Sequence, residues 1–317
     1  MKSSIEIVTP APLGSLHGNR MTALRWQGFL EKLGYLVEVT ESWSGDDTAV
    51  LIALHAYRSH QSIVRFKETY PNRPVVLILT GTDLYRDMEN HREVIQSMQL
   101  ADRLIVLQSS ALDLIPPSLL DKAQVIYQSV EINAPSPTPK EDFLVSIIGH
   151  LRDEKDPFCI VRSLPLLPSD SKIQVRHLGQ AMSAPMAEFA KQCNTTLDRY
   201  QWIGEVSHLN ALQILSQSRL MVISSRMEGG AHVVSEAIAL GIPVIASDIP
   251  GNRGLLGDDY PGYFPVGDAK ALADLLYRAE TMPTFYASLQ QQIDLRKEWI
   301  HPAREKQSIQ ELVSGLV

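Results

Sequence analysis

Two glutamates, Glu228 and Glu236, stand on either side of a segment that could bind a phosphorylated ligand. The apolar run 220–223 precedes them, and the apolar-periodic segment 231–240 follows the pair Gly229–Gly230, which predicts a strand, a polar loop and a helix. Glycines let a ligand approach the backbone, and the N–H groups at a helix start favour an anion such as phosphate. We expect Glu228 to reach the group that the phosphates carry, and Glu236 to accept hydrogen bonds from sugar hydroxyls. The alternative is a capped helix with two solvated acids.

A basic loop follows the predicted strand 143–148 and begins at Gly149. Its cations, Arg152 and Lys155, are three residues apart and could converge on a diphosphate, where they would neutralise the charge of a departing nucleotide. The alternative for this loop is a solvated turn.

Three further polar loops follow apolar runs in the first half of the chain. The first contains Gly14 and Gly18 with a concentration of anion-binding groups, and its alternative interpretation is a structural helix cap with exposed arginines. In the other two, His55 and Asp83 are candidates to orient or deprotonate an acceptor, although either residue alone could be structural. The anion-binding candidates of the three loops are His17, Asn19, Arg20, Arg25, Arg58 and Arg86.

These loops need a scaffold of parallel strands, because ligands of such sheets bind outside the carboxyl ends of the strands. Short apolar runs alternate with helical patterns in both halves, which predicts an α/β chain with doubly wound sheets. The Pro-rich stretch 131–140 reads as a linker, or alternatively as a loop within one domain, and 251–257 reads as a Gly-rich loop. We predict domains at 1–132 and 141–283, and a helical tail at 284–317. The predicted strands are 5–8, 36–39, 50–54, 75–79, 104–107 and 125–127, then 143–148, 173–178, 200–203, 220–223 and 244–246.

Composition excludes several classes of protein. The 317 residues carry a formal net charge of -7 with 44% hydrophobic residues, which argues against a general nucleic-acid binder or a protein of anionic membranes. No apolar stretch approaches the roughly 20 residues of a membrane span. Cys159 and Cys193 have no metal-ligand spacing and read as ordinary buried thiols of a reducing compartment. We therefore expect a cytoplasmic protein with no stable membrane association, and the oligomeric state stays open.

Residues 224–251 resemble the donor site of the retaining group 1 glycosyltransferases (family 4 type), which have the GT-B fold. The resemblance implies two Rossmann-like domains that face each other across a cleft, with the tail packing back on the N-terminal domain. It also implies that Glu236 holds the ribose of a nucleotide sugar, that Glu228 contacts the transferred sugar, and that Arg152 and Lys155 stabilise the leaving diphosphate. The implied donor-binding residues are Gly149, Glu228, Gly229, Gly230, Ala231, His232 and Glu236.

Four segments, 18–26, 53–56, 79–87 and 260–268, make the resemblance narrower. They are similar to the selenosugar synthases of selenoneine biosynthesis, over residues 9–268 of this chain. That similarity implies transfer of the sugar of a UDP-sugar, typically UDP-N-acetylglucosamine, to selenophosphate, with release of UDP and formation of a carbon–selenium bond. The expected acceptor-binding residues are His17, Gly18, Asn19, Arg20, Arg25, Thr82 and Arg86, and the expected catalytic residues are Arg152, Lys155, Glu228, His55 and Asp83.

The sequence has no evident acidic metal-binding cluster, so we expect no metal or other cofactor. Two rival functions stay open. One is an ordinary retaining GT-B glycosyltransferase with a sugar or lipid acceptor, and the other is a non-catalytic protein that binds a nucleotide sugar. A test for UDP release separates the second rival from the enzymes, although an epimerase on a similar scaffold would release UDP without selenophosphate.

Overall fold

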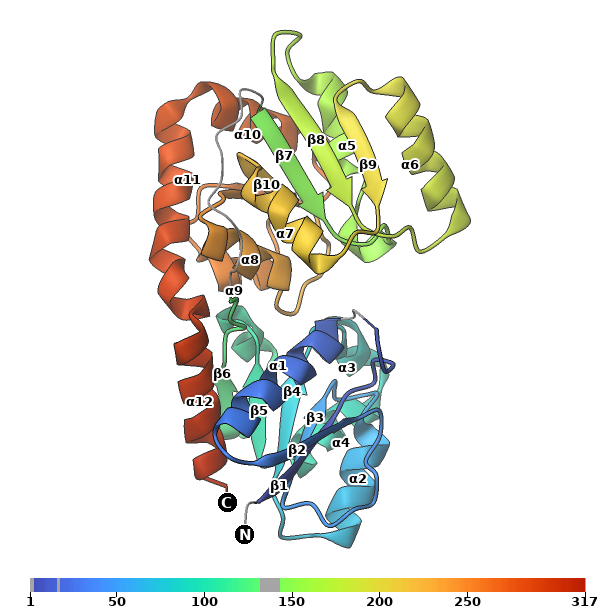
Figure 1. The fold of residues 1–317 in the computed structure, drawn as a ribbon, viewed down its shortest axis with the longest axis vertical. Coiled ribbons are helices and arrows are strands. Elements are labelled where there is room, and N and C mark those ends of the chain that lie inside the picture. The colour runs from blue at the N-terminus through green and yellow to red at the C-terminus, as the bar shows by residue number, and fades with distance from the viewer. Residues whose placement is uncertain (1–2, 16–17, 132–142, 317) are drawn as a thin grey trace. The chain divides into compact units, whose positions relative to one another are not determined.

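The computed structural model describes residues 3–15, 18–131 and 143–316. The chain forms two compact units, the first from Met1–Ser129 and His301–Val317 and the second from Val130–Ile300. The predicted tail, 284–317, is therefore divided between them: α11 (Pro283–Arg296) belongs to the second unit and α12 (Pro302–Ser314) to the first (Figure 1). Most of the predicted linker lies outside the described residues.

The first unit contains a six-stranded parallel sheet of order β2-β1-β3-β4-β5-β6. Its order reverses between β1 and β3, so the loops that follow these two strands diverge at the carboxyl edge of the sheet. The apolar runs predicted this sheet well, and only the last strand lies two residues earlier than expected. The strands are β1 (Ser4–Val8), β2 (Leu36–Thr40), β3 (Val50–Leu54), β4 (Val75–Leu79), β5 (Arg103–Val106) and β6 (Ala123–Val125).

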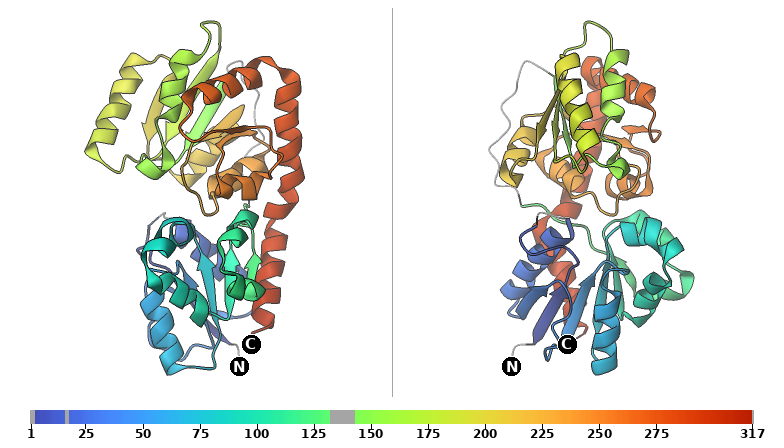
Figure 2. Two further views of the ribbon diagram at one scale, coloured as in Figure 1. Left: turned by 180° about the vertical axis from the view of Figure 1, so that it is seen from behind. Right: turned by 90° about the vertical axis from the view of Figure 1, so that its right-hand side faces the viewer.

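Helices cover both faces of this sheet, which is why its central strands are apolar at every position (Figure 2). Alternate residues of β3 divide between two cores. Ile52 packs in the core that contains residues of α1 (Gly18–Lys32) and α12, whereas Leu51 packs in the core that contains residues of α2 (His60–Thr69) and α4 (Arg92–Leu100). Short helical segments complete the unit: η1 (Asp83–Asp87), α3 (Met88–Asn90), η2 (Ser109–Leu114) and η3 (Pro117–Lys122).

The second unit also contains a six-stranded parallel sheet, of order β12-β11-β10-β7-β8-β9. Here the order reverses between β7 and β10. Both the basic loop and the glutamate loop therefore leave the sheet at its switch point, where ligands of such sheets bind. The strands are β7 (Phe143–Ile148), β8 (Ile173–Leu178), β9 (Tyr200–Gly204), β10 (Leu220–Ile223), β11 (Val244–Ser247) and β12 (Tyr263–Phe264).

The helices of this unit pack in neighbouring groups, α5 against α10 and α7 against α8. The helix α5 (Cys159–Ser163) is short, because Pro165 ends its regular part and leaves a 3₁₀ turn. The helical elements are η4 (Asp153–Lys155), α5 (Cys159–Ser163), η5 (Leu164–Leu166), α6 (Ala184–Thr196), α7 (His208–Ser216), α8 (His232–Leu240), α9 (Pro250–Leu256), α10 (Ala269–Thr281), α11 and η6 (Lys297–Ile300).

One prediction about this unit was wrong. Residues 251–257, expected to form a Gly-rich loop, form α9 up to residue 256. Pro250 occupies the first turn, where its fixed φ suits a helix and its missing N–H costs nothing. Gly251 is required by packing, because a Cβ there would lie 2.1 Å from the carbonyl oxygen of Glu228. Glycine marks a close approach of two backbones here, which the sequence pattern alone does not distinguish from a flexible turn.

Candidate functional site

The predicted basic and acidic loops of the second unit meet at one ion pair. Lys155, at the end of η4, places its Nζ 2.5 Å from Oε1 of Glu228. Both side chains are largely buried, with 21% of the lysine and 9% of the glutamate exposed. A cation and a carboxylate that are withdrawn from water attract each other more strongly than a surface pair. The two loops are therefore joined at the switch point.

A chain of hydroxyl groups holds the carboxylate of Glu228. Ser225 donates a hydrogen bond to Glu228 Oε1 at 2.5 Å, and Ser247 of β11 donates to the carbonyl oxygen of Ser225. Behind them, the buried Asn252 of α9 donates to the carbonyl and hydroxyl oxygens of Ser247. Gly251 closes the arrangement by lying against the backbone of Glu228. Three elements thus fix the position of one acidic group.

The backbone around Lys155 is held in an uncommon conformation. Asp156, the next residue, adopts left-handed φ and ψ of 38° and 57°, which a residue with a side chain seldom does without support. Arg162 supplies that support by donating two hydrogen bonds to the Asp156 carboxylate. The hydroxyl of Ser224 donates to the carbonyl oxygens of both Lys155 and Asp156. Such strained positions often accompany functional side chains.

A small cavity lies beside Lys155, lined by residues of β7, β8 and β10 and of the loops after them. Gly149 and Lys155 contribute to its wall, as do Ser224 and Ser225. His177 also lines it, and burial lowers the pKa of this histidine to about 3, so the imidazole is neutral at physiological pH. Arg152, predicted beside Lys155, is exposed to solvent.

The second glutamate lies one element further along the chain, in α8. Glu236 is buried, and its Oε1 lies 2.6 Å from Nε2 of His208 and 3.6 Å from Nε2 of His232. The hydrogen bond to Glu236 raises the pKa of His208 and outweighs the opposing effect of partial burial. Sequence reasoning missed His208, because its contact joins residues 28 positions apart on two helices.

The start of α8 has a polarity that suits an anion. Ala231 is its N-cap residue and offers no side-chain hydrogen bond to the first turn. The first N–H groups of such a helix have no partner within the helix, and the helix dipole adds partial positive charge there. Gly229 and Gly230 lie between Glu228 and this start. The ion pair with Glu228 brings the ammonium of Lys155 to the same loop, and Glu236 lies in the helix that follows the loop. The combination can bind an anion that carries hydroxyl groups.

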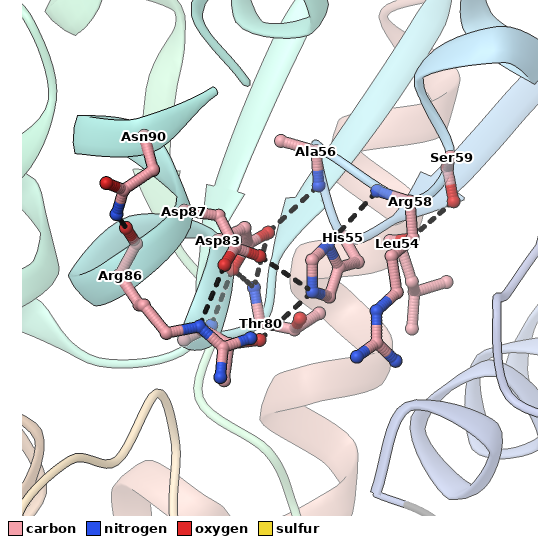
Figure 3. A network of polar contacts seen from close by, with 12 residues as sticks. Leu54, His55, Ala56, Arg58, Ser59, Thr80, Asp83, Arg86, Asp87 and Asn90 are labelled. Atoms are coloured by element: carbon pink, nitrogen blue, oxygen red, sulfur yellow. Dashed lines mark hydrogen bonds and ion pairs between the residues drawn. The ribbon is translucent and has the colours of Figure 1, made fainter. Parts of the chain in front are cut away.

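Some candidate residues of the first unit, His55, Asp83 and Arg86, belong to a polar network shown in Figure 3. Asp83 is fully buried at the start of η1, and its carboxylate accepts hydrogen bonds from the backbone N–H groups of Ala56, Thr80 and Gly81. Backbone donors on several sides occupy the oxygen atoms of this carboxylate as hydrogen-bond acceptors. This geometry supports a structural role for Asp83, which joins the loops after β3 and β4, and does not support the predicted catalytic role.

His55 lies beside Asp83 and is almost fully buried (Figure 3). Its backbone has a φ of 74°, an uncommon value for a residue other than glycine. The ring Nδ1 accepts the N–H of Arg58, so in the neutral ring the proton is on Nε2, 3.0 Å from Thr82 Oγ1. Burial lowers the pKa of His55, Asp83 and Asp87 oppose this effect, and Arg58 and Arg86 strengthen it. Because Nδ1 already accepts a hydrogen bond and Nε2 carries the proton, this imidazole is poorly placed to act as a general base.

The other predicted acceptor residues differ in their surroundings. Arg25 donates two of its N–H groups to Glu305 of α12, so this guanidinium holds a helix, which does not support the predicted role in acceptor binding. Arg20 is 5% exposed, and its Nε and Nη1 have no hydrogen-bond partner within the described residues. Gly18 and Asn19 begin α1, Arg86 pairs with the adjacent Asp87, and His17 lies outside the described residues.

The described residues contain no group of three or more His, Cys, Asp or Glu side chains arranged to hold a metal ion. In the same part of the chain no helix is both long and apolar enough to cross a membrane. Cys159 and Cys193 are free, buried thiols, and burial raises the pKa of Cys159 to about 11. These thiols are therefore protonated at neutral pH.

Comparison with known proteins adds the following. The profile of the family "Glycosyl transferases group 1" matches residues 128–305. HepE of Anabaena in complex with UDP superposes with a TM-score of 0.78 at 17% identity, covering 100% of both chains. Sucrose-phosphate synthase of Thermosynechococcus elongatus gives a TM-score of 0.82 at 15% identity, covering 99% of both. A glycosyltransferase of Rickettsia africae gives 0.73 at 14% identity, covering 99% of this chain and 98% of that one. No curated protein matches the sequence.

Proposed function

Since the chain belongs to the group 1 glycosyltransferases and has the GT-B fold, we propose that it transfers the sugar of a UDP-sugar to selenophosphate. The selenium atom attacks the anomeric carbon and forms a carbon–selenium bond. The bond from that carbon to the diphosphate oxygen breaks, and its electron pair leaves with UDP. The preferred donor in this proposal is UDP-N-acetylglucosamine.

The observation that carries the donor assignment is the buried Lys155–Glu228 pair at the switch point between β7 and β10. Lys155, Arg152 and the start of α8 supply positive charge to the diphosphate as it departs. Glu228 contacts the transferred sugar, and Glu236 accepts hydrogen bonds from the ribose. HepE, a structural neighbour of the chain, binds UDP and UDP-glucose, which supports this choice of donor.

The acceptor assignment rests on a separate observation in the first unit. The guanidinium of Arg20 is withdrawn from water at the first turn of α1, with two nitrogen atoms that lack partners within the described residues. A buried cation without a partner is costly, so an anionic ligand at this position would relieve the cost. Selenophosphate is a small anion of suitable charge. The similarity of residues 18–26 and 79–87 to the selenosugar synthases supports the same acceptor.

Turnover of two substrates tests the proposal. The purified protein is incubated anaerobically with UDP-N-acetylglucosamine, with and without selenophosphate, and both UDP and the mass of any selenium-containing sugar are measured. We expect selenophosphate-dependent UDP release and a selenosugar, both lost in Lys155→Ala and kept in Lys270→Ala, whose lysine is exposed on α10. We also expect the reaction to proceed in the presence of a metal chelator.

Other results would point elsewhere. If the UDP-sugar binds and selenophosphate changes nothing, the acceptor assignment fails, and sugar and lipid acceptors become the candidates. If no acceptor promotes UDP release, the protein binds nucleotide sugars without transferring them.

A further inference from the structure

The carboxylate of Glu236 is held unequally at its two oxygens. Oε1 accepts a hydrogen bond of 2.6 Å from His208 Nε2 and lies 3.6 Å from His232 Nε2. Within the described residues, Oε2 accepts no hydrogen bond. A hydrogen bond to one oxygen restricts the orientation of a carboxylate, and the other oxygen keeps its lone pairs for a ligand.

His208 is well placed to act as the fixing group. It is the first residue of α7, whose start is capped by Ser207, and α7 packs against α8. Its side chain is 53% exposed whereas that of Glu236 is 6% exposed, so the imidazole reaches the buried carboxylate from the solvent side. The titratable group in contact with this imidazole is Glu236. His232 lies near the same oxygen of Glu236, and both residues are on α8.

We propose that His208 is a positioning residue for nucleotide binding: by holding Oε1 of Glu236, it orients Oε2 to accept a hydrogen bond from a ribose hydroxyl. This inference rests on the donor site of the proposed function. It adds a residue outside the glutamate segment, on a different helix, and it assigns different tasks to the two oxygens of one carboxylate. His208 itself needs no contact with the ligand.

A ligand series separates positioning from a general effect of charge. Wild type, His208→Ala and His208→Gln are titrated calorimetrically with UDP and with 2′,3′-dideoxy-UDP. Loss of an oriented carboxylate should weaken UDP binding about tenfold in His208→Ala, and should change binding of the dideoxy nucleotide less than about twofold. The amide of His208→Gln also donates a hydrogen bond and should restore most of the UDP affinity. Asn210→Ala, an exposed change in the same helical turn, is the matched control and should bind like wild type.

Steady-state kinetics give a second readout. A ribose contact is made equally in the ground state and the transition state, so His208→Ala should raise KM for the UDP-sugar about tenfold and leave kcat within about twofold. Equal weakening of both nucleotides by His208→Ala, or no weakening of either, would overturn the positioning role. A wild-type protein that binds UDP no better than its dideoxy analogue would also overturn it. If wild type does not bind UDP at all, the proposed donor site itself fails.

Discussion

A buried carboxylate on α12, that of Glu305, joins three segments of the first unit. It accepts hydrogen bonds from Nε and Nη2 of Arg25 at 2.9 to 3.2 Å and from Nε1 of Trp26 at 3.0 Å, both on α1. It also accepts the backbone N–H of Ser129 at 2.7 Å. The side chain of Glu305 is 1% exposed, so its donors depend on the carboxylate rather than on solvent. We predict that Glu305→Ala strongly destabilises the first unit.

The size of the effect follows from the donors that lose their acceptor. Arg25 is 18% exposed and recovers some hydration, whereas Trp26 and Ser129 are 0% and 2% exposed and do not. A buried donor left without a partner costs about 1–3 kcal/mol, and removal of one member of a buried ion pair costs about 3–5 kcal/mol. We expect Glu305→Ala to lower the free energy of unfolding by about 4 kcal/mol, a large share of the roughly 5–15 kcal/mol of a typical domain.

Urea unfolding, followed by circular dichroism and tryptophan fluorescence, measures this loss. Glu311→Ala is the control, because Glu311 is exposed on the same helix and accepts a hydrogen bond from a surface glutamine, so its removal should cost less than about 0.5 kcal/mol. Glu305→Gln keeps the shape but loses the charge beside Arg25, and should fall between the two. A Glu305→Ala protein within about 1 kcal/mol of wild type would refute the reasoning.

Three further changes are predicted. The pKa of His208, measured by NMR, should exceed 6.5 and should fall towards 6.5 in Glu236→Gln; an unchanged pKa would contradict the His208–Glu236 pair. Because the folded-state pKa is raised, the stabilisation by this pair is present below pH 6.5 and is lost as pH rises through the folded value. Burial lowers the pKa of His177 to about 3, so protonation of this histidine should lower the free energy of unfolding by about 3 kcal/mol between pH 7.5 and pH 4.5. In urea titrations, the free energy of unfolding of His177→Gln should therefore fall by about 3 kcal/mol less over this range than that of wild type. Gly251→Ala places a Cβ 2.1 Å from the Glu228 carbonyl oxygen. It should lower the free energy of unfolding by about 1–3 kcal/mol and remove most of the UDP-release activity. Full activity would show that the two backbones can separate.

Much of the fold could be predicted from the sequence, because parallel strands covered on both faces leave an unmistakable pattern. Residues 75–79 are apolar at every position and form β4 with the predicted bounds. Residues 143–148, apolar except for Ser146, likewise form β7 with the predicted bounds. The prediction at 251–257 failed for a physical reason. A glycine that permits close packing of a helix and a glycine that permits a turn are the same residue in the sequence, and only the position of the Glu228 backbone distinguishes them.

The candidate site was predictable to a lesser degree. The sequence indicated that Lys155 and Glu228 each lie in a polar loop after a predicted strand, and the family resemblance implied that both act at the donor. The structure places them in one ion pair. The contact of His208 with Glu236 has no local signal, since it depends on how two helices pack. Asp83 and Arg25 carry the right chemistry for an acceptor site, yet the structure commits their charges to backbone amides and to α12. Residue type fixes what a side chain can do, and its partners decide what it does.

The central claim is that the second unit binds a nucleoside diphosphate through Lys155. Calorimetric titration of wild type, Lys155→Gln and the control Lys270→Gln with UDP and with uridine tests it most directly. The account predicts that wild type and the control bind UDP far more tightly than uridine. It also predicts that Lys155→Gln loses about tenfold in affinity for UDP and nothing for uridine. A wild-type protein that binds UDP and uridine equally, or a Lys155→Gln protein that binds UDP as wild type does, would contradict it.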